Sequence, residues 1–357
     1  MRNQAGGPVH SARGIAVAAG GAFAAFYTFY TAAPVIFDGF SPSSGLRVAL
    51  LMVVVVAVQP LVLVRGPWFR NRRCTVLATL VAMSLGTVTI PFAGYWPGPL
   101  LLAAGFGVFV VTSTAWVKET AIPGRLGKAL GLYGFGSAAG GAAGAPTGLL
   151  LAHHTGTGGV ALAGALFAAV ALTPTVRVHT ASDPSTFEPQ SEAASPSTGC
   201  TPTKKRTPGL LMVSATGHLL AVTIYAAALS ALGSVSHAQN IWATVGTAFV
   251  IQASLSAGRL IGGALSDHWT PALTGTTALI VLTTSAAGFT LSTSPTVTLM
   301  TAGLIGLTSG TGQTAALTAM MRRARDPAST ERTSAIWNIC FDIGLGFGAL
   351  STGLVHA

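Results

Sequence analysis

Charged side chains are scarce in this sequence. Asp, Glu, Lys and Arg make up only 8% of its 357 residues, whereas a water-soluble domain carries about 25%. Half of the residues are hydrophobic, and the mean hydropathy is +0.63. Such a chain cannot cover a water-facing surface with polar side chains. The composition therefore excludes an ordinary soluble protein and indicates one that lies in a lipid bilayer.

Other features that are rare or missing narrow the chemistry. The three cysteines stand far apart and have no metal-ligand spacing, which excludes a disulfide framework and a zinc site. No Gly-x-x-x-x-Gly-Lys-Ser/Thr motif is present, so ATP is not the energy source within this chain. The nine acidic residues are not paired inside any predicted span, which argues against an integral membrane enzyme such as a lipid or prenyl transferase. We expect no enzymatic activity, no metal and no cofactor.

Long apolar runs are abundant. A membrane-spanning helix needs about 20 mostly apolar residues, and eleven stretches meet this requirement, of which one is short. The predicted spans are 14–37, 45–64, 74–93, 97–117, 127–151, 158–175, 209–232, 241–264, 272–291, 296–320 and 333–355. The sequence therefore predicts an all-α polytopic membrane protein.

A polar segment over 176–208, rich in Ser, Thr and Pro, divides the spans into six and five. It has too little apolar surface to fold alone and is typical of a flexible linker. We therefore predict a six-helix bundle over 1–175, a cytoplasmic linker over 176–208 and a five-helix bundle over 209–357.

The basic residues predict the orientation. If the N-terminus is cytoplasmic, the connecting segments on that side contain almost all Lys and Arg, and those on the other side contain only Arg47. Short loops rich in Lys and Arg stay in the cytoplasm, so we expect a multi-pass cell-membrane protein with a cytoplasmic N-terminus. The net charge of +10 is then a topology signal. No contiguous basic face with polar or aromatic readers indicates a nucleic-acid partner.

The fifth and last spans resemble each other. Each follows an Arg, contains a Phe-Gly or Phe-Asp pair, and ends in Thr-Gly-Leu, at 147–149 and 352–354. One short gap aligns them. This repeat predicts two pseudo-repeated helical bundles, which are common in transporters.

Two local patterns extend the comparison to a known family. The sequence Gly-Arg-Leu-Ile-Gly-Gly-Ala-Leu-Ser-Asp at 258–267 looks like the Gly-x-x-x-Asp signature at the end of the eighth helix of the major facilitator superfamily, with Gly263 and Asp267 in place. The basic and Gly-rich positions that usually follow are absent. Exporters of this superfamily carry a spaced glycine pattern on the fifth helix, and the chain keeps this spacing but has its proline displaced by one residue. The matching residues are Gly131, Gly140, Gly144, Pro146 and Gly148.

The chain thus resembles the major facilitator superfamily over nearly its whole length. The resemblance implies secondary active transport of a small molecule by alternating access, with proton-coupled efflux as the first expectation. The partners would be the substrate, the membrane lipids and a proton gradient; the resemblance does not predict the oligomeric state. The alternatives are an uptake permease of the same fold and a non-transporting or truncated membrane protein. The fourth helix lacks the Arg of many proton-coupled exporters, since residues 102–106 contain none.

The family has twelve helices, and the last predicted span here is the eleventh. In the family the twelfth helix is a peripheral, lipid-facing support. The sequence leaves three interpretations open. The absence of a twelfth helix is tolerated, is compensated by a partner, or marks a truncated and inactive product.

Ionisable residues inside predicted spans are the first candidates for function, because a charge in the bilayer is unfavourable by at least about 2.5–3.5 kcal/mol. Asp342 lies about ten residues into the last span, with Asn338 one turn earlier on the same face. This carboxylate either binds a proton or a cationic group, or locks helix packing. Arg259 lies inside the eighth span and binds an anionic substrate or, as the favoured interpretation, forms a structural ion pair.

The remaining candidates are polar or aromatic groups inside spans. Tyr27 and Tyr30 either line a cavity or pack against neighbours and lipid. We expect Gln252, Gln313 and His218 to line the cavity, although a lone His in a helix is usually just hydrogen-bonded.

Asp267 is predicted to cap a helix, and the resemblance implies a latch between the two halves. The glycines of the fifth helix allow close helix approach, and the resemblance places them against the eighth helix.

Overall fold

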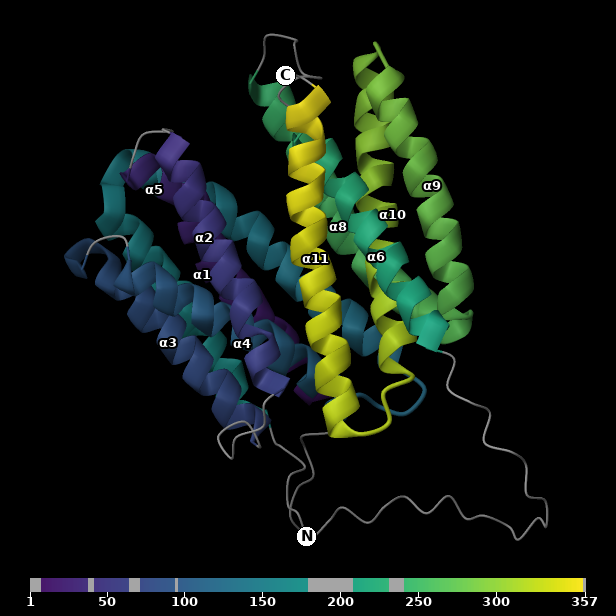
Figure 1. Cartoon of the computed structure of the whole chain (residues 1–357), viewed down its shortest axis with the longest axis horizontal. Coiled ribbons are helices and arrows are strands. Elements are labelled where there is room, and N and C mark those ends of the chain that lie inside the picture. The colour runs from purple at the N-terminus through teal and green to yellow at the C-terminus, as the bar shows by residue number, and fades with distance from the viewer. Residues whose placement is uncertain are drawn as a thin grey trace, which may run out of the picture.

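The computed structural model describes residues 8–37, 42–63, 71–93, 96–178, 208–230 and 241–355, and these residues form helices joined by short turns, with no strand among them (Figure 1). In chain order the elements are α1 (Pro8–Phe37), α2 (Pro42–Val58), η1 (Pro60–Leu63), α3 (Arg72–Ala93), α4 (Pro97–Thr120), α5 (Leu126–Arg177), α6 (Pro208–Ser230), α8 (Ile241–His268), α9 (Pro271–Leu291), α10 (Pro295–Met321) and α11 (Pro327–Val355). Most of these helices begin at a proline, whose fixed φ and missing N–H suit the first helical position.

The all-helical prediction is confirmed in the described residues, and seven of their helices are long and apolar enough to cross a membrane. They are α1, α3, α4, α5, α6, α8 and α9. This set does not include α2, α10 or α11, and it treats α5 as a single span although two spans were predicted there. The division into six and five spans therefore remains a prediction.

Helix α5 contains two antiparallel segments. Gly156, with a φ of 63°, interrupts its helical geometry. Before this residue, Gly136 lies against Ala16 and Gly148 against Thr28, so the chain runs parallel to α1. After it, Gly21 of α1 lies against Phe167 and Ala171, whereas Gly14 lies against Pro174 and Val178, so the chain runs back. The predicted spans 127–151 and 158–175 therefore lie on two antiparallel helical segments that meet at Gly156.

The helices pack as two groups. Helices α1 to α5 contact one another and form the first group, and α6 to α11 form the second group. In the first group, Gly140 and Gly144 let α5 approach the backbone of α1. In the second group, Gly344 and Gly348 do the same for α11 against α6. Glycines of α5 and α11, the two helices in which the sequence indicates a repeat, thus allow close packing in both groups.

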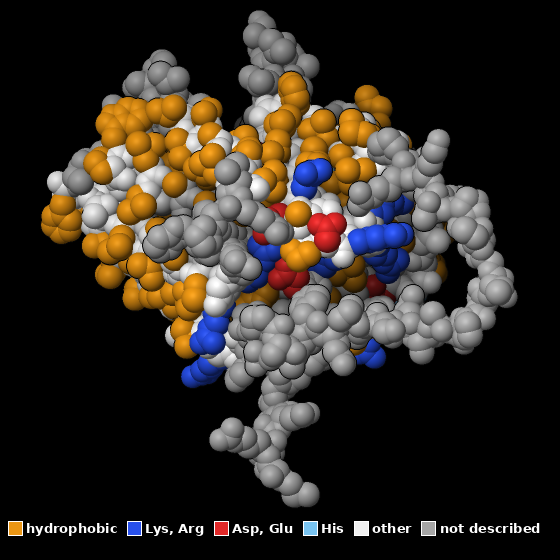
Figure 2. Space-filling view, turned by 60° about the horizontal axis from the view of Figure 1, so that its bottom comes forward, with side chains coloured by type: hydrophobic (Ala, Val, Ile, Leu, Met, Phe, Trp, Pro, Cys, Tyr) orange, Lys and Arg blue, Asp and Glu red, His pale blue; other side chains and the backbone are white. Residues whose placement is uncertain are grey.

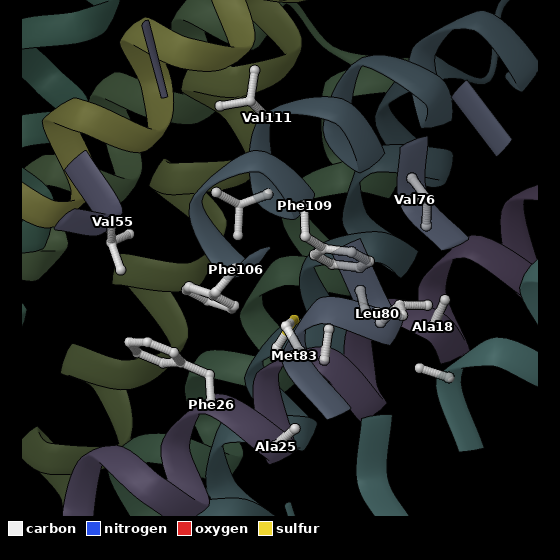
Figure 3. Packing of buried hydrophobic residues seen from close by; sticks show 14 of the residues in the cluster. Ala18, Ala25, Phe26, Val55, Val76, Leu80, Met83, Phe106, Phe109 and Val111 are labelled. Carbon is white, nitrogen blue, oxygen red and sulfur yellow. The ribbon is translucent and has the colours of Figure 1, made fainter. Parts of the chain in front are cut away.

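The largest apolar cluster fills the first group and continues into α10 and α11. Phe26 of α1 stacks on Phe106 of α4, with ring centroids 4.0 Å apart and an interplanar angle of 8° (Figure 3). Leu80 and Met83 of α3 are completely buried beside these helices. This packing holds the aromatic residues of α1 at the boundary between the two groups.

Candidate functional site

A cavity of about 790 Å³ lies between the two groups, within the range of about 300–1,000 Å³ that is usual for small-molecule sites. Helices α1, α2, α4 and α5 of the first group and α6, α8 and α11 of the second line it. Most of its wall is aromatic or aliphatic. The polar residues of the wall are Tyr27, Tyr30, Tyr133, Ser137, Tyr225, Gln252, Arg259, Asn338 and Asp342.

Asp342 lines this cavity from α11, as does Asn338 one turn earlier. The Asp342 carboxylate accepts a hydrogen bond from Gln59 Nε2 of the first group at 2.9 Å. The Asn338 side chain donates to the Ser334 carbonyl at 2.9 Å. Asp342 is the one acidic residue of the described part of the chain that lies at this cavity. A carboxylate here is positioned to contact both a ligand and the first group.

Arg259 of α8 also lines the cavity, and its side chain is 5% exposed. It donates to the Gly134 carbonyl at 3.0 Å, to Ser137 Oγ at 2.7 Å and to Gln313 Oε1 at 2.9 Å. None of these acceptors is charged. The favoured expectation of a structural ion pair is therefore wrong for the described residues, because no carboxylate among them lies within 4.0 Å of this guanidinium.

Aromatic side chains surround these polar groups. Tyr27 and Tyr30 line the cavity together with Phe23 and Phe26, and the rings of Tyr27 and Tyr30 meet edge to face at 5.8 Å. On the opposite wall, the Tyr225 hydroxyl donates to Gln252 Oε1 at 2.5 Å. Gln252 therefore lies at the cavity, where it was expected. Of the two interpretations given for Tyr27 and Tyr30, both hold, because the rings line the cavity and also pack against neighbouring aromatic rings.

Gln313 and His218 do not line this cavity, contrary to expectation. Both are completely buried. Gln313 lies behind Arg259, accepts its hydrogen bond and donates to Ser309 at 2.9 Å. His218 stacks on Trp337 with centroids 4.8 Å apart. A polar residue inside a span can face a neighbouring helix as readily as a cavity, and spacing along one helix does not distinguish the two.

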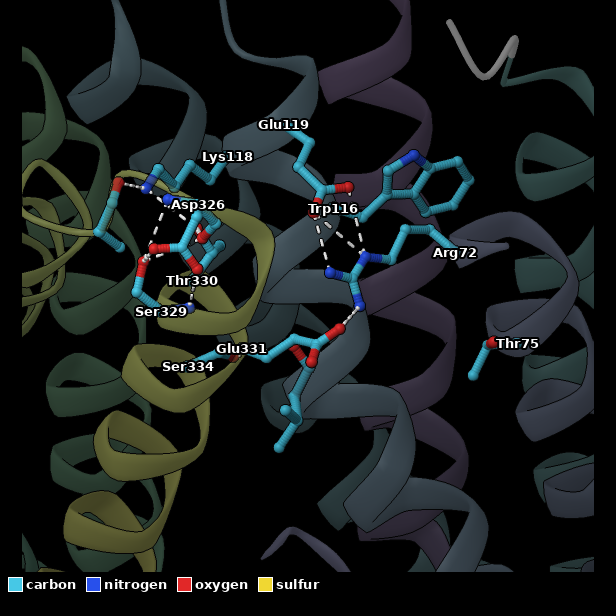
Figure 4. A network of polar contacts seen from close by, with 12 residues as sticks. Arg72, Thr75, Trp116, Lys118, Glu119, Asp326, Ser329, Thr330, Glu331 and Ser334 are labelled. Atoms are coloured by element: carbon cyan, nitrogen blue, oxygen red, sulfur yellow. Dashed lines mark hydrogen bonds and ion pairs between the residues drawn. The ribbon is translucent and has the colours of Figure 1, made fainter. Parts of the chain in front are cut away.

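Ion pairs join the groups at one end of the molecule, here called the ionic end. Arg72 of α3 donates to Glu119 of α4 at 2.9 Å and to Glu331 of α11 at 2.6 Å (Figure 4). Lys118 donates to the Ala324 carbonyl and to Thr330 Oγ1. Figure 2 shows this face, where acidic and basic side chains gather among the apolar surface. These bonds connect α3 and α4 of the first group with the start of α11 in the second.

Asp267, at the end of α8, adds a second connection at the ionic end. Its carboxylate accepts hydrogen bonds from the backbone N–H groups of Gly127 and Lys128, both at 2.8 Å. It also accepts from Arg322 at 3.1 Å. Asp267 thus caps the first turn of α5 in the other group, whereas Thr270 caps the adjacent helix α9. The cap and the contact between groups are the same set of bonds.

The glycines of α5 face two different helices. Gly131 packs against Gly263 and the Arg259 backbone of α8, across the boundary between groups. The other three do not: Gly140, Gly144 and Gly148 pack against α1 within the first group. Pro146 lies exposed inside α5. The expectation that this whole glycine face meets the eighth helix is therefore correct only for its first turns.

Several residues of the site escaped the sequence analysis. Tyr133, Ser137 and Tyr225 line the cavity, and Gln59 contacts Asp342. Gln59 interrupts an apolar run, which is a signal of the same kind as those used for Gln252. Glu331 carries no such signal, because it stands outside the apolar run in a polar helix start.

Comparison with known proteins identifies the family. The profile of the Major Facilitator Superfamily matches residues 13–349. The chain belongs to the Major Facilitator Superfamily. Among curated protein sequences, none matches. As a superfamily member the chain is a small-molecule transporter of the membrane and not an enzyme.

Solved transporters of the superfamily share the fold. The human organic anion transporter MFSD10 (TETRAN) has a TM-score of 0.71 at 14% identity, covering 98% of this chain and 94% of that one. The transporter FucP in the outward conformation has a TM-score of 0.65 at 11% identity, covering 94% and 91%. A single-residue variant of the E. coli fucose:proton symporter FucP has a TM-score of 0.64 at 13% identity, covering 96% and 91%. At identities of 11–14%, these similarities show the fold alone.

Proposed function

We propose that this superfamily member is a proton-coupled exporter that works by alternating access in the cell membrane. The observation that supports this most directly is the cavity itself. It lies between two helix groups, and one carboxylate among the described residues lines it. At the ionic end, hydrogen bonds and an ion pair join the two groups.

The ionic end is assigned to the cytoplasm. The basic residues of the described loops and helix ends gather there, and Lys and Arg in short loops are retained in the cytoplasm. They include Arg72, Lys118, Lys128, Arg322 and Arg323. On this assignment the described conformation is closed to the cytoplasm, and the N-terminus is cytoplasmic.

Transport then requires the contacts of the ionic end to break. Opening the cavity to the cytoplasm separates Glu331 from Arg72 and Asp267 from the first turn of α5. It also parts the close glycine contact between Gly131 and Gly263. Because every one of these contacts joins the two groups, the groups can rock as bodies while their internal packing stays intact.

Asp342 is the proposed proton carrier. A charged carboxylate inside the bilayer is unfavourable by about 2.5–3.5 kcal/mol, which favours uptake of a proton. The hydrogen bond from Gln59 stabilises the charged form and comes from the other group. A movement of the groups that breaks this bond therefore changes the proton affinity of Asp342, which is what coupling requires. Export is the proposed direction because the glycine spacing of α5 resembles that of exporters.

The test replaces Asp342 with Asn in proteoliposomes under an imposed pH gradient. Asn has nearly the same shape and retains an acceptor for Gln59, but it cannot carry a proton. We expect gradient-driven flux of transported compounds, chosen from a panel of lipophilic acids, amines and neutral molecules, to fall to background.

The matched control is Asp326→Asn. It makes the same chemical change at the start of the same helix, at a residue that accepts a hydrogen bond from the Ser329 backbone and lies outside the cavity. Asn is as good a helix cap as Asp, so flux should persist. Gradient-driven flux that survives in D342N removes Asp342 from the mechanism.

A further inference from the structure

Arg259 is a buried cation for which the described part of the chain supplies no anion. Its side chain is 5% exposed, and its three hydrogen-bond acceptors are a carbonyl, a hydroxyl and an amide oxygen. A guanidinium has five N–H donors. The Nε donor has no acceptor among the described residues. Both a negative charge and an acceptor are therefore missing at this position.

The missing charge is unusual because of where Arg259 lies. A buried charge is normally paired, since leaving it uncompensated is strongly unfavourable. Asp342 lines the same cavity, but it binds Gln59 and forms no ion pair with Arg259. Hydrogen bonds to Ser137 and Gln313 hold the guanidinium in place without neutralising it. The described residues thus fix the position of the guanidinium and leave its charge uncompensated.

The surroundings of Arg259 specify the rest of the ligand. Its guanidinium carbon lies 6.0 Å from the centre of the Phe341 ring. Phe341 continues a stack with Trp337 and His218, at centroid distances of 6.0 and 6.3 Å. Across the cavity, Tyr27 stacks near Phe23 at 6.4 Å. Flat aromatic walls on both sides favour a planar apolar body.

From these observations we infer that the transported substrate is an organic monoanion with an aromatic body, whose carboxylate or sulfonate pairs with Arg259. This inference rests on the proposed transport function and adds its substrate class. Asp342 is left for the proton, so the ligand needs no cationic group. The cationic group of a zwitterion or an amine would instead pair with Asp342. Tighter binding of these compounds would therefore contradict the inference.

The test measures binding to the purified full chain in nanodiscs at pH 7.5. The three probes have one size and differ in charge: 2-naphthoate, 2-naphthamide and 2-(aminomethyl)naphthalene. A fourth probe, 3-(2-naphthyl)alanine, is zwitterionic. A charge-assisted hydrogen bond contributes enough to separate such analogues by a factor of ten or more. We expect 2-naphthoate to bind at least about tenfold more tightly than the other three.

Two variants of Arg259 locate the effect. R259K keeps the charge and should keep most of the preference for 2-naphthoate. R259Q removes the charge and should bind 2-naphthoate and 2-naphthamide equally, while its binding of the amide shows that the cavity is intact. The control R332Q removes an exposed Arg of α11 that lies outside the cavity and should retain the preference. If R259Q does not fold, the ranking of the four probes by the unmodified protein decides the matter.

A preference for the amine or the zwitterion, no binding of 2-naphthoate, or an unchanged preference in R259Q would overturn the inference. Flux of the same probes in proteoliposomes separates this failure from that of the proposed function. A protein that exports the amine but not 2-naphthoate is a transporter without the anion site. A protein that binds 2-naphthoate through Arg259 but does not transport it has the anion site and lacks the proposed transport function.

Discussion

Replacing Glu331 with Gln should open the ionic end. Glu331 and Arg72 are buried, with side chains 5% and 8% exposed, and their charged atoms lie 2.6 Å apart. Removing one partner of an isolated buried pair is unfavourable by about 3–5 kcal/mol. Here Arg72 keeps its contact with Glu119, so its charge remains neutralised. The loss then approaches that of one charged hydrogen bond, about 1.5–3 kcal/mol.

This energy is present only while the two groups touch, because Arg72 belongs to α3 and Glu331 to α11. E331Q should therefore shift the equilibrium towards the open ionic end by roughly 10- to 100-fold. A protein that is closed there about 99% of the time would then be closed about 50–90% of the time. Such a change is large enough to measure directly.

The assay is a distance distribution between spin labels on Cys residues introduced at Pro123 and Ala328. These positions are exposed and lie at the ionic end, on opposite groups. The native cysteines are replaced beforehand. We expect a longer distance to appear in E331Q and the shorter one to weaken.

The matched control is Glu119→Gln. Glu119 binds the same Arg72 but lies on α4, in the same group as α3. Its loss should lower the thermal stability of the first group and leave the distance distribution almost unchanged. Equal shifts in E119Q and E331Q, or no shift in either, would refute the argument that Glu331 acts by joining the groups.

Two further pairs of substitutions apply the same contrast between and within groups. A Cβ at Gly131 would lie 2.6 Å from the Arg259 carbonyl oxygen on α8, so Gly131→Ala should populate the longer distance, whereas Gly144→Ala, which disturbs packing against α1, should lower the melting temperature alone. Asp267→Ala removes a cap between groups and Thr270→Ala one within the second group; each costs about 1 kcal/mol. In the same spin-label assay we expect a roughly fivefold shift for D267A and none for T270A, and the reverse result would show that the cap on α5 is not a latch.

Much of the site follows from sequence because a polar group in an apolar run is conspicuous. Asp342, Arg259, Gln252 and the two tyrosines of α1 were singled out as candidates in this way, and all of them line the cavity. For Arg259 the favoured interpretation was instead a structural ion pair, which the described residues do not supply. The same reasoning misplaced Gln313 and His218, since the polarity of a residue does not reveal which side of its helix faces a neighbour. Gln313 proves to be a partner of Arg259.

Contacts between distant segments escaped prediction for a different reason. Spacing rules relate residues that are three or four positions apart on one helix. Arg72 and Glu331 are 259 positions apart, and each looked like an ordinary charge at a loop or helix end. Their pairing depends on how α3 and α11 meet, which no local pattern specifies.

The sequence by itself determined that this is a membrane protein made of helices. The scarcity of charged residues and the long apolar runs can be read without knowing how the chain folds. It also identified which ionisable groups the bilayer must accommodate. Only the tertiary structure decided how those charges are satisfied: Asp342 by a hydrogen bond from Gln59, and Arg259 by neutral oxygens alone. It also paired Glu331 with Arg72, which the sequence did not indicate. Electrostatic pairing acts over a few ångströms, so it is settled only when the helices have packed.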